Sequence, residues 1–256
     1  MILKGGFNVA GMQPHLRLKP EDVAKYVLLP GDPERVRRIA KFLKAPQELS
    51  CNREYYSICG EYKGIKVLAV STGIGGTSMG IAVEELKNIG AQVLIRVGSC
   101  GALQEGIKLG DIIISCAAVR NDGASVAYIE KGFPAVPHPE VVFALLESAK
   151  QQKIPYWCGI TRSHDSFYTD EEEAIDEYWT KKGILGADME SAALFVIGAL
   201  RGLKTGAVLN TVVEKKGDLK GDINEYVDGD EIAQEGEKRE IVTALEAIYK
   251  IEKDSV

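Results

Sequence analysis

Three arginines stand next to glycine-rich or turn-like segments, an arrangement suited to binding a small oxyanion. They lie in Leu29-Pro-Gly-Asp-Pro-Glu-Arg35, Asn52-Arg53-Glu54 and Arg96-Val-Gly-Ser-Cys-Gly101. Guanidinium groups and glycine-exposed backbone N–H groups together hold multiply charged anions such as phosphate. Far downstream, Gly186-Ala-Asp-Met-Glu-Ser191 carries carboxylates that can accept hydrogen bonds from sugar hydroxyls. A phosphate site together with a sugar site indicates phosphorolysis.

The first of these segments has the features of a loop that opens a helix. Gly31 can turn sharply and expose its N–H, and Pro33 suits the first helical position, so Arg35 falls in the first turn. An anion there would meet backbone donors, the positive end of the helix and a guanidinium. The alternative is structural: Asp32 caps the helix and Arg35 is a solvated charge.

Arg96 ends a strand that is otherwise apolar, Val-Leu-Ile-Arg-Val. An arginine beside the core is costly unless it is paired, so we expect it to face either an anion in a cleft or a buried carboxylate. Gly98, Ser99 and Gly101 follow at once and let backbone and a hydroxyl approach the same ligand.

The segment Ser71-Thr-Gly-Ile-Gly-Gly-Thr-Ser-Met-Gly80 follows a strand and opens a helix. A dinucleotide fingerprint would require glycine where this chain has Ser78, and the chain has no GxxxxGK[ST] loop for ATP. The segment is therefore either a ligand-binding loop or a tight structural turn.

The elements that must position these residues alternate between strands and helices. Apolar runs predict strands at Tyr26–Leu29, Ile65–Ser71, Val93–Val97, Asp111–Ala118, Trp157–Thr161 and Thr205–Val213, with Tyr55–Tyr62 forming a hairpin before the second of them. Helical patterns predict helices at Glu34–Leu43, Thr77–Asn88, Pro139–Gln152, Glu171–Lys182, Glu190–Arg201 and Glu231–Ile251.

This alternation predicts the fold class. Several strands are continuously apolar, which is typical of strands covered on both faces. We therefore expect one α/β domain over residues 1–256, with a central mixed, largely parallel twisted sheet flanked by helices. Thr77 is expected to cap its helix, and Gly217–Asp230 is a candidate mobile loop.

Composition excludes several classes of protein. The net charge of −6 argues against a broad nucleic-acid groove, and no segment has the roughly 20 apolar residues that span a bilayer. The N-terminus lacks the apolar core of a secretory signal. Five cysteines without a CxxC pair favour reduced thiols in the cytoplasm, and three separated histidines make a metal site improbable.

Taken together, the motifs resemble the hexameric nucleoside phosphorylases, a family that includes uridine phosphorylase and the bacterial-type purine nucleoside phosphorylase. The similarity covers nearly the whole chain in order and rests on Pro30-Gly-Asp-Pro33 with Arg35, Asn52-Arg53-Glu54, Ser71–Gly76, Arg96–Gly101, Ser166-Phe-Tyr168 and Met189-Glu-Ser191. The segments Val119–Ser125 and Phe133–Val136 are more similar to the uridine branch.

The resemblance implies a role for each matched residue. Phosphate, the co-substrate, would be bound by Gly31, Arg35, Arg53, Arg96 and Ser99, and ribose by His15, Met189 and Glu190. Phe167 would pack against base and sugar, and Glu54 would help to hold a monovalent cation between subunits. No organic cofactor is implied.

The resemblance also implies an oligomer. The family forms a hexamer, a trimer of dimers, whose active sites are shared across the dimer interface. Arg53 and His15 would then serve a neighbouring subunit, with residues 1–20 forming an arm that contacts it. From the residues alone, a histidine in a disordered tail is the preferred interpretation of His15.

The chain departs from the family pattern where the base should bind. Uridine enzymes read uracil with a glutamine and an arginine after the Phe-Tyr pair, whereas this chain has Thr169-Asp-Glu-Glu-Glu173. One hypothesis is that Glu171 or Glu173 accepts a base N–H while Lys215 faces a base carbonyl. A second is that Glu214, with its pKa raised by burial, donates a proton to a purine. Together with Arg96 and Glu190, Glu214 and Lys215 complete the expected catalytic set.

The leading prediction is an enzyme that cleaves a nucleoside with phosphate, with uridine first among substrates. The alternatives are the same reaction on purine nucleosides or methylthioadenosine, a hydrolytic nucleosidase, and a nucleoside-binding protein without activity. Phosphate dependence and a nucleoside panel separate them.

Overall fold

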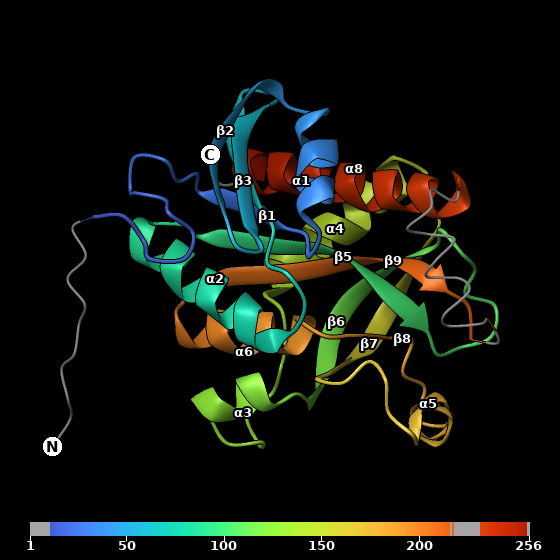
Figure 1. Ribbon diagram of the computed structural model, residues 1–256. Coiled ribbons are helices and arrows are strands. Elements are labelled where there is room, and N and C mark those ends of the chain that lie inside the picture. Colours follow the sequence, from blue (N-terminus) through green and yellow to red (C-terminus); the bar gives the residue numbers. More distant parts are fainter. Residues whose placement is uncertain (1–10, 216, 218–230, 255–256) are drawn as a thin grey trace, which may run out of the picture.

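The computed structural model describes residues 11–215, 217 and 231–254, which form a mixed sheet covered by helices on both faces (Figure 1). The strands are β1 (Tyr26–Leu29), β2 (Lys44–Asn52), β3 (Tyr55–Tyr62), β4 (Ile65–Val70), β5 (Val93–Ala102), β6 (Ile112–Asn121), β7 (Tyr156–His164), β8 (Gly186–Asp188) and β9 (Lys204–Val213). The helices are α1 (Pro33–Ala40), α2 (Gly76–Ile89), α3 (Gly123–Tyr128), α4 (Pro139–Gln151), α5 (Glu172–Thr180), α6 (Ser191–Leu200) and α8 (Glu231–Asp254).

The strands follow the order β2-β3-β4-β1-β5-β8-β7-β6-β9, and β9 also pairs with β5. The five strands from β5 to β9 therefore close into a ring. The pairings of β1 with β4 and β5, of β5 with β9, and of β7 with β6 and β8 are parallel, and the others are antiparallel. The expected mixed, largely parallel sheet is confirmed.

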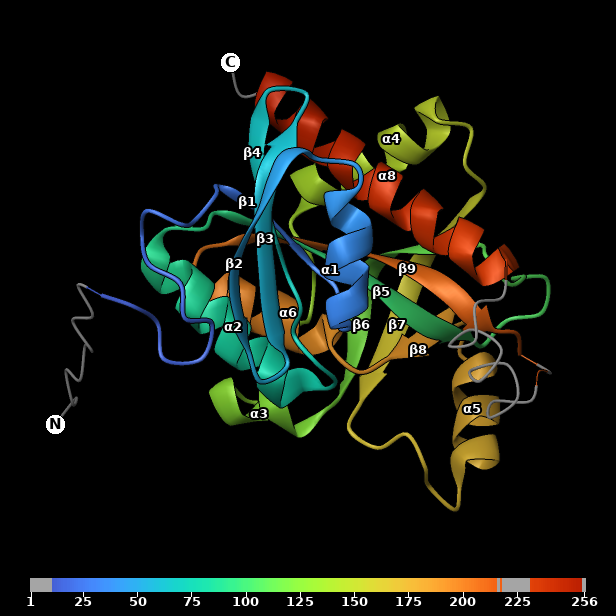
Figure 2. The same ribbon diagram turned by 45° about the horizontal axis from the view of Figure 1, so that its top comes forward.

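Two apolar layers hold the helices to the sheet. Leu86 of α2 and Phe195 of α6 belong to one core, while Val36 of α1 and Ile248 of α8 belong to the other. Figures 1 and 2 show α1, α4 and α8 on one side of the sheet and α2, α3 and α6 on the other. In both views α5 stands apart, beside β7 and β8.

Most predicted elements are present within a few residues of their expected bounds, and β1 matches at both ends. The sequence did not predict β2, β8 or α3. β2 is largely exposed and lacks an apolar run, while β8 and α3 have only three and six residues. Short or exposed segments carry little periodic signal, so tertiary pairing decides them.

The predicted cap of α2 was wrong. Gly75, with φ of 98°, is the N-cap rather than Thr77, and no side chain of the helix caps it. Instead, the N–H of Gly75 donates to Glu190 Oε1 at 2.5 Å, so a carboxylate from the distant segment before α6 satisfies this helix end.

Gly217–Asp230, the expected mobile loop, lies outside the described residues apart from Gly217. Among the helices of the described segments, we find none with the length and apolarity that crossing a bilayer demands.

Candidate active site

Arg96 lies at the centre of a buried charge cluster within β5, which continues to Ala102, so the expectation that Arg96 ends its strand was wrong. Only 4% of its surface is exposed. Its Nε donates to Asp188 Oδ2 at 2.9 Å, and one terminal nitrogen lies 2.5 Å from Glu190 Oε2. The other terminal nitrogen, NH1, is buried and has no hydrogen-bond partner within the described part of the chain. A buried guanidinium with an unused donor is suited to binding a ligand oxygen.

Gly98 makes room for this guanidinium. A Cβ added at Gly98 would lie 2.5 to 2.8 Å from the guanidinium atoms of Arg96, far inside van der Waals contact. The arginine therefore lies across the backbone of its own strand, two residues further along. The Arg-Val-Gly spacing is thus a packing requirement.

Asp188 fixes the orientation of Arg96. Its Oδ1 accepts from Ser163 Oγ at 2.6 Å, and its Oδ2 accepts from the backbone N–H and hydroxyl of Ser191. The neighbouring Glu190 is 4% exposed, and burial raises the pKa of its carboxyl while Arg96 opposes that rise. Of the two expectations for Arg96, the buried carboxylate is therefore present, and NH1 remains for an anion.

Arg35 approaches β5 from α1. As expected it lies in the first helical turn behind Asp32, whose side chain accepts from the N–H of Glu34. Arg35 is 3% exposed, so the solvated-charge alternative was wrong. It donates to the carbonyl of Val97 at 3.0 Å and to Ser99 Oγ at 2.8 Å.

Two glutamates of α8 lie against Arg35. Glu237 accepts from its Nε at 2.8 Å, and Glu240 Oε1 lies 3.2 Å from NH1. Glu240 is fully buried, and burial raises its pKa to about 8 despite the opposing effect of Arg35. The pKa of Arg96 is raised, with burial opposing the rise and Glu190 and Asp188 causing it; Arg35 also opposes the rise, so the two guanidinium groups are near one another.

Two loops close the phosphate side. The N–H of Gly73 donates to the carbonyl of Gly31 at 3.0 Å, and a Cβ at Gly31 would come within 3.1 Å of Gly73 O. Gly73 in turn contacts Glu54, because a Cβ there would lie 2.8 Å from Glu54 Cγ. Gly31 and Glu54 thus lie on adjoining loops, while Arg53 is exposed at the β2–β3 turn with φ of 55°.

His15 is fixed to its own chain close to that turn. Its Nδ1 lies 2.6 Å from Glu85 Oε1, and its backbone N–H donates to the same carboxylate. Its carbonyl accepts from Asn52 Nδ2 at 2.7 Å. Glu85 belongs to α2 and is buried. His15 is therefore held in place, and the interpretation of residues 11–20 as a disordered tail was wrong.

The expected base residues lie on or before α5. Phe167 is partly buried and packs edge-on against Tyr168, with the ring centroids 4.9 Å apart. Glu171 and Glu173 are both exposed. Met189 is partly buried beside Glu190, whose Oε2 accepts from the N–H of Met189 at 3.3 Å.

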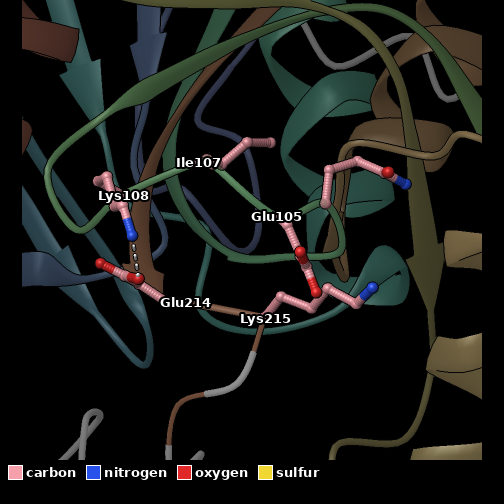
Figure 3. A pocket seen from close by; sticks show the side chains of 7 residues that line it. Glu105, Ile107, Lys108, Glu214 and Lys215 are labelled. Atoms are coloured by element: carbon pink, nitrogen blue, oxygen red, sulfur yellow. Dashed lines mark hydrogen bonds and ion pairs between the residues drawn. The ribbon is translucent and has the colours of Figure 1, made fainter.

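Glu214 and Lys215 line a separate cavity of about 240 Å³ beyond the end of β9 (Figure 3). Glu214 is 35% exposed and lies 3.2 Å from Lys108 Nζ. It also accepts from the N–H of Leu109. The burial that the proton-donor hypothesis requires is therefore absent, because Glu214 is accessible and paired with a cation. The hydrogen bond from Lys181 lowers the pKa of Glu177 on α5, and the charge of Lys215 adds to this effect, so Lys215 lies near that helix.

A family model described as "Phosphorylase superfamily" matches residues 25–245. The chain belongs to the phosphorylase superfamily. It is 40% identical to a uridine phosphorylase of Thermococcus kodakarensis, over 93% of this chain and 86% of that protein.

Two solved structures show the same fold as this phosphorylase. A uridine phosphorylase of Vibrio fischeri is 44% identical, with a TM-score of 0.88 over 95% of this chain and 100% of the other. A purine nucleoside phosphorylase of Toxoplasma gondii, in complex with immucillin-H, is 32% identical, with a TM-score of 0.86 over 95% of this chain and 97% of the other.

The sequence did not predict several buried polar residues of this phosphorylase. Asp188, Glu237 and Glu240 hold the two arginines, and Arg162 lies buried on β7. The available signal was weak: each is a charged residue in an apolar stretch or on a buried helix face. Finding their partners requires the sheet register.

Proposed function

We propose that this phosphorylase cleaves uridine with inorganic phosphate, giving uracil and ribose 1-phosphate. The observation that carries the proposal is the buried, unbonded NH1 of Arg96, on a guanidinium held by Glu190, with Arg35 bonded to Ser99 three residues further along β5. A phosphate oxygen suits the donors, and a ribose hydroxyl suits Glu190. The uridine phosphorylases among its relatives supply the choice of base.

The reaction needs only positioning and electrostatics from these residues. Phosphate is held by Arg35, Arg96, Ser99 and the backbone at Gly31. The bond from C1′ to the base breaks with its electron pair going to the base nitrogen, and a phosphate oxygen then forms the new bond to C1′. The base takes up its proton from water. Fixed orientation and donors aimed at the developing charges provide the rate enhancement.

Ribose binding is assigned to Met189, Glu190 and a neighbouring subunit's copy of His15. Glu190 is already held by Arg96 and by the N–H of Gly75, so its carboxylate has a fixed direction. His15 and Arg53 flank Asn52 on the surface of their own chain, away from the Arg96 cluster in every contact described. This position supports the proposal that both residues complete a partner's site.

We further propose that the functional unit is a hexamer built from such dimers, and that it works in the cytoplasm. The five cysteines are unpaired, which fits a reducing compartment. Glu54, on the loop against Gly73, would contribute to a monovalent-cation site between subunits.

The alternative substrate class is purine nucleosides, which the similarity to the Toxoplasma gondii enzyme favours. The deciding experiment measures release of free base from uridine, thymidine, inosine, adenosine and methylthioadenosine, with and without phosphate. Uridine should be cleaved fastest, and only with phosphate present. Cleavage at equal rates without phosphate would make the protein a hydrolase and refute the proposal.

A further inference from the structure

Arg162 of β7 is a buried arginine to which the proposed function gives no role. It is 5% exposed, and its Nε donates to Asn121 Oδ1 at 3.2 Å. Its NH1 is buried without a hydrogen-bond partner in the described segments. The nearest carboxylate oxygens, on Asp176 and Glu172 of α5, are 3.6 and 3.8 Å away, which is too far for a hydrogen bond.

Asp176 presents the complementary group. Its Oδ1 is buried and also lacks a hydrogen-bond partner among the described residues. A donor and an acceptor thus lie 3.6 Å apart, each unused. Burial lowers the pKa of Arg162 and raises that of Asp176, as expected when neither charge is fully solvated or bonded. A buried pair in this state requires an explanation.

The sheet register places Arg162 on the same face as Ser99, one of the residues assigned to phosphate. Arg162 pairs with Ala187, and Ala187 pairs with Gly101, so the three share one face of the ring. Ser99 lies on that face too, two residues before Gly101. A Cβ added at Gly101 would meet no atom within 4 Å, so this face is open at Gly101.

The elements around this open face belong to the base side of the proposed site. Phe167 lies in the segment between β7 and α5, and α5 stands beside β7 and β8 (Figure 2). A ring held here would have Ser99 on one side and the Arg162–Asp176 pair on the other.

A donor next to an acceptor can read one edge of a base. Uracil offers a carbonyl oxygen beside a ring N–H, so an arginine can donate to the oxygen while a carboxylate accepts from the nitrogen. On the corresponding edge of cytosine, an amino group replaces the carbonyl and an unprotonated nitrogen replaces the N–H. Cytosine would therefore place its amino group, a donor, against the donating arginine.

We propose that Arg162 and Asp176 are the specificity-determining pair for the base, with NH1 donating to a carbonyl and Oδ1 accepting from the adjacent N–H. The inference rests on the proposed function and deepens it. It replaces Glu171 and Glu173, both exposed, as the residues that read the base.

Arg162→Lys tests the donor, because lysine keeps the charge facing Asp176 but lacks the guanidinium fork. The KM for uridine should rise about 10- to 100-fold, the scale for a hydrogen bond to a charged group. The KM for phosphate and the melting temperature should stay near wild type. Arg120→Lys is the matched control, since the five hydrogen bonds of Arg120 all go to its own segment, at Ser125, Ile129, Glu130 and Phe133.

Asp176→Ala tests the acceptor with a modified substrate. Wild type should prefer uridine to N3-methyluridine, which lacks the ring N–H, and Asp176→Ala should lose most of that preference. Glu177→Ala is the control on the same helix, because Glu177 is exposed and pairs with Lys181. Its preference should be unchanged.

Calorimetric binding of uracil separates this inference from the proposed function. A wild type that binds uracil without turnover refutes phosphorolysis, and weaker binding by Arg162→Lys would still support the pair. An active wild type with an unchanged uridine KM in Arg162→Lys would overturn the pair alone. So would parallel losses of uridine, phosphate and thermal stability, which would mark Arg162 as purely structural.

Discussion

At the scale of single residues, the chemistry of the site depends on where one guanidinium can lie. Arg96 lies over Gly98 because any side chain at that position would occupy its place. Glycine is therefore needed at position 98 because Arg96 packs against it. Its backbone φ is not positive, so the conformation of the chain does not require a glycine there. This makes Gly98 a sensitive test of the phosphate site.

Gly98→Ala should impair phosphate use while leaving the fold intact. The guanidinium is the flexible end of Arg96 and can move aside, but it would then leave the phosphate position. A displacement of about 1 Å costs on the order of 10²-fold in kcat/KM. Steady-state kinetics at varied phosphate measure the loss. Gly132→Ala, at an exposed glycine with nothing within 4 Å of the new Cβ, should be silent.

Arg96 itself should respond differently to lysine and alanine. Arg96→Ala leaves Asp188 and Glu190 buried without their cation, and breaking a buried pair costs about 3–5 kcal/mol, so a lower melting temperature should accompany lost activity. Arg96→Lys keeps the charge but loses the fork that spans two carboxylates and an anion. It should remain folded and lose phosphorolysis. Normal phosphate kinetics in Arg96→Lys would remove Arg96 from the site.

At the scale of elements, α8 matters because it brings two carboxylates against an arginine of α1. Glu237 and Glu240 lie one helical turn apart and both face Arg35. The charge of Arg96, on β5, also opposes the rise in the pKa of Glu240. Its Oε2 accepts from the N–H of Asn210, which ties α8 to β9. The helix is thus joined to the site by charge as well as by apolar packing.

Glu240 should make stability fall as pH rises. Its pKa is about 8 in the folded chain against 4.5 for an ordinary glutamate, so between these values the folded chain holds a proton that the unfolded chain has lost. The free energy of unfolding therefore decreases through this window and levels off above it. The glutamine in Glu240→Gln cannot titrate. The melting temperature of this variant should therefore fall less than that of wild type between about pH 5 and about pH 9.

Glu246→Gln is the control for that experiment. Glu246 lies on the same helix but accepts from Tyr62 and Lys63, away from Arg35. Its melting curve should follow the pH dependence of the wild type. Parallel curves for Glu240→Gln and wild type would mean that Glu240 is already ionised in the folded chain.

At the scale of the whole molecule, the proposal divides each active site between two subunits. Arg96 is buried within β5, whereas Arg53 is exposed on a hairpin beside the anchored His15. If the sites are shared, a subunit that lacks Arg53 can still supply Arg96 to a site completed by its partner. A subunit that lacks Arg96 can likewise supply Arg53 to its partner's site.

Mixing two inactive variants tests this division. Arg53→Ala and Arg96→Lys homo-oligomers should each be inactive, while co-refolded mixtures should recover about a quarter of wild-type activity, because half the dimers are mixed and each has one intact site. Activity of the mixture is compared with that of the separate variants. No recovery, with mixed oligomers shown by mass spectrometry, would place both arginines in one subunit's site.

The sequence alone determined much of the fold, because apolar runs and helical periodicity are local signals. It placed β1 at its observed bounds and Arg35 behind its capping aspartate. It also indicated Arg96 as a residue that needs a partner. It missed β2 and β8, whose pairing depends on strands elsewhere in the chain rather than on their own pattern.

Only the tertiary structure decided what surrounds those arginines. The partners of Arg96 and Arg35 lie 92 and 202 residues away, at Asp188 and Glu237. The face that Arg162 shares with Gly101 exists only through the register of β7, β8 and β5. The sequence determines the type of each side chain. The burial and the ion pairing of these side chains depend on how distant strands pair, and they decide which hydrogen-bond donors are left to bind a substrate.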